Sequence, residues 1–215
     1  MKQQELHFLS GSLRLEGRLT IPAQAEAAAG AVICHPHPLY GGSMDNNVVS
    51  AISGALAEAG IASLCFNFRG AGRSEGVHDG AQGEIDDALA AFDFLAGLSG
   101  VDSRRVGLAG YSFGGAVVLQ AALQRGTIGA VAAVSPHEIP ALGAAAWPWL
   151  LLCGSADTLV PPDSALQQKK KIAGGDSAAA VEVIAGADHF WYGYEELLAR
   201  RVVSFFQRYL SAGSS

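Results

Sequence analysis

The sequence predicts an α/β fold of three layers, in which a doubly wound, mostly parallel sheet of about eight strands lies between two layers of helices. Short apolar runs without polar alternation recur along the chain, as expected of strands buried on both faces of a parallel sheet. Helix-like stretches separate most of them, and such alternation is typical of right-handed crossovers that cover both faces. Half of the 215 residues are hydrophobic, which supplies a core for one domain over 1–215.

The elements follow in order along the chain. Residues 5–10 and 12–21 alternate polar and apolar side chains around Gly11, which predicts an antiparallel hairpin. A small-residue loop or short turn follows over 23–30. Six further strands are predicted on the apolar runs 29–35, 61–68, 105–111, 130–135, 149–154 and 180–186. Helices are predicted over 46–59, 84–98, 113–124, 163–173 and 192–210. We expect the first two strands to run antiparallel to the others, and 211–215 to be a frayed tail.

Charge and composition exclude several classes of partner. The net charge is −6 and the pI is near 5.4, whereas nucleic acids and anionic membranes attract basic surfaces. The N-terminal residues lack the apolar core of a signal peptide, and no run approaches the roughly 20 apolar residues of a membrane span. We therefore expect a cytoplasmic protein. Cys34, Cys65 and Cys153 lie in strand-like runs without a CxxC pair, which favours reduced, buried thiols.

A G-x-S-x-G motif, Gly110-Tyr-Ser112-Phe-Gly114, stands between a strand-like and a helix-like run. This setting is typical of a nucleophile elbow, a tight turn that holds the serine at positive φ. The flanking glycines are expected because a Cβ there would collide with a neighbouring strand or helix. The helix that follows would direct its free N–H groups toward developing negative charge.

A serine nucleophile needs a base, and the base needs an orienting acid. Asp157 follows the apolar run 149–154, and His189 follows the last predicted strand. In open α/β sheets the functional crevice lies beyond the carboxyl ends of the strands, so Ser112, Asp157 and His189 are expected at one edge. Their chain order, serine, acid, histidine, fits the elbow motif.

Other histidines and acids compete for these roles. His7 fits an ordinary strand residue, His78 a solvated loop residue, and His137 follows a strand but precedes Asp157. For the acid, the alternatives are Glu138 after an earlier strand, Asp163 as a helix N-cap and Asp188 next to the histidine in sequence. Chain order and strand-end position favour Asp157 and His189.

The chain resembles the α/β-hydrolases, in particular the small bacterial enzymes without a cap domain that are related to the dienelactone hydrolases. The resemblance covers nearly the whole length. It rests on "CHPHPLYGGSMDNNVV" (34–49), "FNFRGAGRSEG" (66–76) and the segments around the triad. Dienelactone hydrolases carry cysteine in the elbow, whereas this chain has Ser112, so their lactone substrate is not implied.

Acyl transfer also requires two N–H donors that hold the oxyanion. One is expected to be the backbone N–H of Phe113. The other is expected from the loop after the third strand, where Pro36 and Pro38 have no N–H. If His37 begins the superfamily's H-G-x-x-G segment, the donor is Leu39, which we favour; if the segment begins two residues earlier, it is His37.

Several further residues have structural or functional interpretations. His35 and His37 are expected to support their loop by hydrogen bonds, since no third ligand for zinc is evident. Arg69 is expected to hold neighbouring loops, with an anion site formed with Arg73 as the alternative. Trp191 and Tyr192 either wall the substrate site or pack the last helix.

Only Pro136 to Ala146 lies between the two strand-like runs where many relatives insert a lid. The site is therefore expected to be shallow and open. The sequence predicts a serine hydrolase that cleaves small, soluble carboxylic esters or thioesters through an acyl-enzyme, without cofactor or metal. An acyltransferase with the same triad and a non-catalytic binding protein are the alternatives. No nucleic-acid or membrane partner is expected, and the oligomeric state, with a homodimer among the options, is left open.

Overall fold

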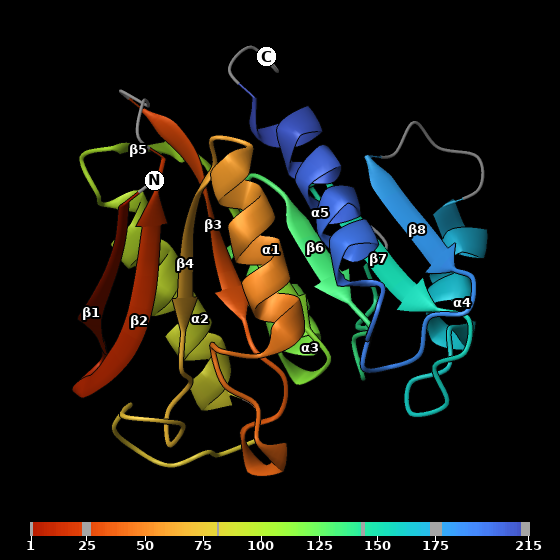
Figure 1. Cartoon of the computed structure of the whole chain (residues 1–215), viewed down its shortest axis with the longest axis horizontal. Helices are drawn as coiled ribbons and strands as arrows, with labels where there is room; N and C mark the ends of the chain where they lie inside the picture. Colours follow the sequence, from red (N-terminus) through yellow and green to blue (C-terminus); the bar gives the residue numbers. More distant parts are fainter. Residues whose placement is uncertain (1, 23–26, 81, 143–144, 173–177, 212–215) are drawn as a thin grey trace.

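A computed structural model of the chain describes residues 2–22, 27–80, 82–142, 145–172 and 178–211, and it contains one eight-stranded sheet (Figure 1). The strands are β1 (Lys2–Ser10), β2 (Leu13–Ile21), β3 (Ala28–Cys34), β4 (Ala62–Phe66), β5 (Val101–Tyr111), β6 (Val131–Val134), β7 (Trp149–Gly154) and β8 (Ala179–Ile184). The α-helices are α1 (Asn47–Glu58), α2 (Gln82–Ala96), α3 (Phe113–Arg125), α4 (Asp163–Ile172) and α5 (Glu195–Leu210). A short 3-10 helix, η1, spans Pro38–Tyr40.

The strand order is β1-β2-β4-β3-β5-β6-β7-β8, with every pair from β4 to β8 parallel. This confirms the mostly parallel, doubly wound sheet. The expected direction of the first strand was wrong. β1 pairs antiparallel with β2, and β2 pairs antiparallel with β4. Because a hairpin reverses the chain, β1 runs in the same direction as β3 to β8, and β2 is the antiparallel strand.

The helices cover both faces of the sheet. Side chains of α1 and α5 pack together with one face, in a cluster that includes Val48, Ile52 and Phe206. Figure 1 shows these two helices side by side in front of the sheet. Helices α2 and α3 cover the other face, where Phe92, Leu95 and other side chains form the second cluster. Each cluster lies between the sheet and one layer of helices, so the fold has three layers.

Several element boundaries differ from expectation. β5 begins at Val101 rather than at Arg105, because Val101 pairs with Ala28 ahead of a register shift. The polar residues 102–105, which follow Val101 in the strand, are exposed or only partly buried. α5 begins at Glu195 rather than at Tyr192, because Trp191 and Gly193 have positive φ and cannot continue a helix. Of the small-residue loop, 23–26 lies outside the described residues, as do 212–215 of the expected tail.

The parallel strands place their following loops at one end of the sheet, which we call the carboxyl edge. All three cysteines are buried and free. Burial raises the pKa of Cys65 to about 11 and that of Cys153 to about 12, so these thiols are poor nucleophiles at neutral pH. None of the helices in the described part of the chain has the length and apolar character of a membrane-spanning segment.

Candidate active site

Ser112 stands at the carboxyl edge, between the end of β5 and the start of α3. Its backbone has φ 54° and ψ −112°, and its N–H donates to the carbonyl of Val134 at 2.9 Å. A Cβ at Gly110 would lie 2.1 Å from the Gly114 carbonyl oxygen, and one at Gly114 would lie 2.4 Å from the Cys34 carbonyl oxygen. The two flanking glycines therefore let the turn close against α3 and β3, as the motif predicts.

The histidine after β8 and the aspartate after β7 lie in line with this serine. His189 Nε2 is 3.1 Å from Ser112 Oγ, and His189 Nδ1 is 2.8 Å from Asp157 Oδ2. His189 is 8% exposed and Asp157 is 3% exposed. With its Nδ1–H donated to the carboxylate, the imidazole presents Nε2 as an acceptor for the serine hydroxyl proton. The three residues expected to act together are thus linked in a row, with His189 within hydrogen-bond distance of both Ser112 and Asp157.

The carboxylate of Asp157 is fixed by its own loop. Its Oδ1 accepts hydrogen bonds from the backbone N–H groups of Leu159 at 3.1 Å and Val160 at 2.7 Å. Because these donors occupy one oxygen, the other is directed to the imidazole.

The competing acids lie elsewhere. Glu138 is exposed, and Asp163 is the exposed first residue of α4. Asp188 accepts from the backbone N–H groups of Phe190 at 2.9 Å and Trp191 at 3.0 Å, so it shapes the loop rather than gripping the imidazole.

Residues outside the predicted set hold the histidine loop in place. Tyr111 donates its hydroxyl to the backbone carbonyl of His189 at 2.6 Å. Trp191 donates its indole N–H to the Ser135 hydroxyl at 3.1 Å. Trp191 is fully buried and packs in the cluster of α1 and α5, whereas Tyr192 is 71% exposed. The sequence left both readings of these aromatics open, and it gave no signal for Ser135 beyond its place at a strand end.

Hydrogen bonds in the loop after β3 bear on the choice of the second oxyanion donor. The backbone N–H of Leu39 donates to His37 Nδ1 at 3.3 Å, where it caps η1, so it is engaged within its own loop. No hydrogen-bond acceptor for the backbone N–H of His37 is found among the described residues. Phe113 is the first residue of α3, where a backbone N–H has no acceptor within the helix. The alternative reading, His37 together with Phe113, fits these contacts better.

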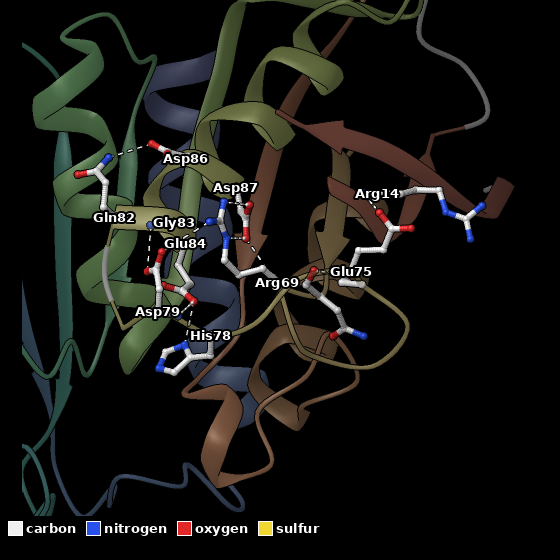
Figure 2. Close-up of polar contacts among 12 residues, drawn as sticks. Arg14, Arg69, Glu75, His78, Asp79, Gln82, Gly83, Glu84, Asp86 and Asp87 are labelled. Carbon is white, nitrogen blue, oxygen red and sulfur yellow. Dashed lines mark hydrogen bonds and ion pairs between the residues drawn. The ribbon is translucent and has the colours of Figure 1, made fainter. Parts of the chain in front are cut away.

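Polar side chains join the loops behind this site. The Arg69 guanidinium donates two hydrogen bonds to Asp87, of 3.0 Å from Nε and 2.8 Å from Nη2 (Figure 2). These bonds support the expectation that Arg69 holds neighbouring loops rather than an anion. Arg73 Nε donates one hydrogen bond to Glu16 Oε2 at 2.7 Å. His35 is buried, accepts from the Phe68 N–H at 3.1 Å, and donates to the Pro36 carbonyl at 2.6 Å.

His78 differs from its expected solvated state. Its side chain is 10% exposed, and Nδ1 lies 2.8 Å from Oε1 of the buried Glu84. Figure 2 shows this pair beside Asp79. The sequence did not predict this pair, because an acidic residue such as Glu84 is common in the first turn of a helix. In the described part of the chain, no group of three or more His, Cys, Asp or Glu residues is arranged to hold a metal ion.

The chain is similar in sequence to known proteins. Residues 10–157 match the family described as X-Pro dipeptidyl-peptidase (S15 family). An uncharacterised protein of Rickettsia prowazekii is 32% identical over 202 residues, which are 89% of this chain and 84% of the relative.

Two solved structures are also similar. An alpha-beta serine hydrolase homologue from Coxiella burnetii has 32% identity and a TM-score of 0.82, covering 95% of this chain and 97% of that one. A serine hydrolase without a lid from Xanthomonas campestris has 28% identity and a TM-score of 0.83, covering 99% and 97%.

Proposed function

The chain belongs to the X-Pro dipeptidyl-peptidase (S15) family of α/β hydrolases, and on that premise we propose that it is a serine hydrolase of small, soluble carboxylic esters or thioesters. The observation that carries the proposal is the continuous contact from Ser112 Oγ through His189 to Asp157. Fold alone does not assign activity, but this contact provides a nucleophile, a base and an orienting acid.

The proposed reaction has two halves. His189 Nε2 takes the hydroxyl proton as Ser112 Oγ bonds to the acyl carbon, and Asp157 stabilises the imidazolium. The N–H groups of Phe113 and His37 hold the oxyanion. His189 then protonates the leaving alcohol or thiol as its bond to the acyl carbon breaks. Water, deprotonated by the same imidazole, attacks the acyl-enzyme and releases the acid.

Substrate size is inferred from the segment between β6 and β7. The described residues 135–142 and 145–148 form neither helix nor strand, so this segment supplies no helical cap over Ser112. An uncovered nucleophile favours short acyl groups that need little buried surface. It argues against enzymes that open a lid at an oil–water interface.

Two other activities use the same groups. An acyltransferase would let an alcohol or amine replace water in the second half of the reaction. A peptidase would cleave an amide, and the family description names X-Pro dipeptides. Product analysis with added alcohols or amines, together with an X-Pro anilide, separates both from ester hydrolysis.

A fluorophosphonate probe tests whether the nucleophile is active. We expect the probe to label the wild-type chain at Ser112, and Ser112→Ala to abolish labelling and to lower kcat on short-chain esters by about 10⁴ or more without unfolding. Ser50→Ala, on the exposed side of α1, is the matched control and should react as wild type. If Ser112→Ala keeps a tenth of the esterase activity, another group is the nucleophile.

A further inference from the structure

Three histidine side chains that the proposed triad does not use gather around the ring of Phe113. His37 comes from the loop after β3, His78 from the loop after β4 and His137 from the segment after β6. The ring centroids of His37, His78 and His137 lie 4.9, 5.4 and 5.8 Å from that of Phe113. His37 and His78 are 4.7 Å apart. Loops that are distant in sequence thus bring three imidazoles beside the residue that follows Ser112.

His78 is held as firmly as the proposed catalytic histidine. Its Nδ1 lies 2.8 Å from Glu84 Oε1, the same separation as between His189 and Asp157. The Glu84 side chain is fully buried, and its Oε2 has no partner among the described residues. A buried carboxyl group that accepts from Nδ1 fixes the orientation of the ring. Figure 2 shows the other edge of the ring, with Nε2, turned away from Glu84.

The other two rings also have nitrogen atoms available. His37 Nδ1 accepts from the Leu39 N–H, so Nε2 of that ring carries the hydrogen and is a donor. His137 is exposed and stacks on Phe113 with an interplanar angle of 17°. The cluster therefore presents an N–H donor from His37, and the exposed His137 ring supplies a second.

The electrostatics of the cluster favour an anion. Burial, and then the nearby His78 and His137, lower the pKa of His37, because protonated rings at this distance repel each other. A bound anion would remove that repulsion. The other titratable groups that face the rings are Glu84 and Asp79 behind His78, and Tyr40, whose ring lies 4.8 Å from that of His37. Arg69 is occupied by Asp87 and lies 3.6 Å from Asp79.

We propose that His37, His78 and His137 form a subsite for a carboxylate on the acyl part of the substrate. The acyl part is favoured because Phe113 and His37 also supply the two N–H groups proposed to hold the acyl oxygen. A carboxylate is favoured because imidazole N–H groups and an oxyanion form charge-assisted hydrogen bonds. On a chain of net charge −6, an anionic substrate needs such a local site. This inference rests on the proposed hydrolase function and narrows its substrate class to half-esters of small dicarboxylic acids.

Matched substrates measure the effect of the charge alone. The monoethyl esters of succinate, glutarate and adipate are each compared with the ethyl ester of the corresponding monoamide, which has the same shape and no charge. We expect kcat/KM of the wild type to favour the acid by about tenfold or more for at least one chain length, as one charge-assisted hydrogen bond supplies.

Variants locate the effect. His78→Gln and His137→Gln should each lower the acid-to-amide ratio severalfold, with His78→Gln the larger effect because Glu84 holds that ring. His7→Gln, an exposed histidine on β1, is the matched control and should keep the wild-type ratio. A wild-type ratio near one at every chain length, or a ratio that neither subsite variant changes, overturns the inference.

A binding measurement separates failure of the inference from failure of the proposed function. Glutarate is titrated calorimetrically into Ser112→Ala and into Ser112→Ala with His78→Gln, because binding at the subsite does not require the nucleophile. The subsite is supported if glutarate binds Ser112→Ala and if its affinity for the double variant is about tenfold weaker, even if the wild type hydrolyses none of the esters. Equal affinity, or no binding to either, overturns it, whereas absence of fluorophosphonate labelling overturns the hydrolase proposal alone.

Discussion

Ser112 holds a backbone conformation that few residues other than glycine adopt. Its φ of 54° costs on the order of 1–3 kcal/mol, which surrounding contacts must offset. The other non-glycine residues with positive φ in the described chain are Ser135 (41°) and Trp191 (61°), and these two are hydrogen bonded to each other. Strained backbone therefore concentrates in the loops that carry the candidate nucleophile and base.

Asp157 and Glu138 are the two candidates for the orienting acid that amide substitutions can compare, because each substitution removes the charge and keeps the shape of the side chain. Asp157→Asn keeps an oxygen for the Leu159 and Val160 N–H groups but loses the charge that orients and stabilises the imidazolium of His189. We expect kcat to fall by a factor on the order of 10⁴, measured on a short-chain ester, with little change in fold. Glu138→Gln, at an exposed position, should change kcat less than about twofold. The reverse order of effects would move the acid to the strand end after β6.

Single residues were predictable from sequence where a motif carried them. The elbow motif and the strand ends identified Ser112, Asp157 and His189 as neighbours, and the structure places them in contact. Their catalytic roles stay predictions. The Leu39 donor and the state of His78 were not predictable. Each depends on the local course of a loop, which turns the His37 ring toward the Leu39 N–H in one case and the His78 ring toward Glu84 in the other.

At the scale of elements, the loop between β8 and α5 is fixed at several points. The Tyr111 hydroxyl holds its backbone at His189, and the Asp188 carboxylate holds the next two N–H groups. The Trp191 indole is anchored on Ser135, in the segment after β6. Residues at the carboxyl ends of three strands, β5, β6 and β8, thus contribute to the position of one imidazole.

The Tyr111 hydroxyl offers a test of this positioning. Tyr111→Phe leaves the His189 carbonyl without its 2.6 Å donor, which should cost about 1–3 kcal/mol of unfolding free energy. Because the base is then held less well, we expect kcat to fall about tenfold or more while KM changes little. Fluorophosphonate labelling should slow in parallel. Tyr209→Phe, on α5, is the control. A variant that is less stable but has wild-type kcat and labelling rate would show that the hydroxyl supports the fold alone.

His35 joins two loops at the carboxyl edge and should make stability depend on pH. Burial lowers its pKa to about 4. The unfolded chain, with a histidine pKa of about 6.5, therefore binds more protons between these values, so folding is favoured above pH 6.5 and loses stability as pH falls toward 4. The loss from this residue reaches about 3 kcal/mol.

Urea unfolding at pH 7, 5 and 4 measures how much of the pH dependence of the unfolding free energy comes from His35. His35→Gln should be less stable at pH 7, because the bonds to Phe68 and Pro36 are disturbed, but its stability should fall less between pH 7 and pH 4 than that of the wild type. His7→Gln, with an exposed ring, should retain the wild-type pH dependence. Parallel curves for wild type and His35→Gln would mean that other groups carry the acid sensitivity.

At the scale of the whole molecule, exposed apolar side chains gather around the site. Of the large hydrophobic side chains that are exposed in the described chain, most lie in loops at the carboxyl edge: Leu39, Tyr40, Val77, Leu159, Phe190 and Tyr192. Phe190 and Tyr192 stack with ring centroids 6.2 Å apart. These side chains form a rim that the segment between β6 and β7 does not cover with a helix.

A rim of this kind should contact only the first carbons of an acyl chain. Each buried methylene contributes about 0.8 kcal/mol, or roughly fourfold in kcat/KM. For p-nitrophenyl esters from acetate to palmitate, we expect kcat/KM to rise over the first few carbons and then to flatten or fall. No jump in rate should accompany droplet formation, because no lid has to open. A steady rise to palmitate, or activation by droplets, would indicate a covering element, such as a neighbouring subunit.

The fold was predictable to the level of its layers and of nearly every strand and helix, because unbroken apolar runs identify strands buried between two helical layers. The register and the exact ends were not. The start of β5 depends on pairing of Val101 with Ala28, and the start of α5 on positive φ at Trp191, and neither is visible in local composition. The direction of β1 follows from the pairing partner of β2, β4, which apolar patterning does not specify.

The parallel course of β1 has a practical consequence for handling the protein. Because β1 runs with β3 to β8, Lys2 lies at the end of the sheet opposite the carboxyl edge. The last turn of α5 lies at that same end, where Arg105, near the start of β5, donates to the Leu210 carbonyl at 3.3 Å. Figure 1 shows the start of β1 and the last turn of α5 on that side. Attachment to a sensor chip or resin close to the start of β1 or the last turn of α5 would thus hold Ser112 facing outward, open to ligands in the flowing buffer.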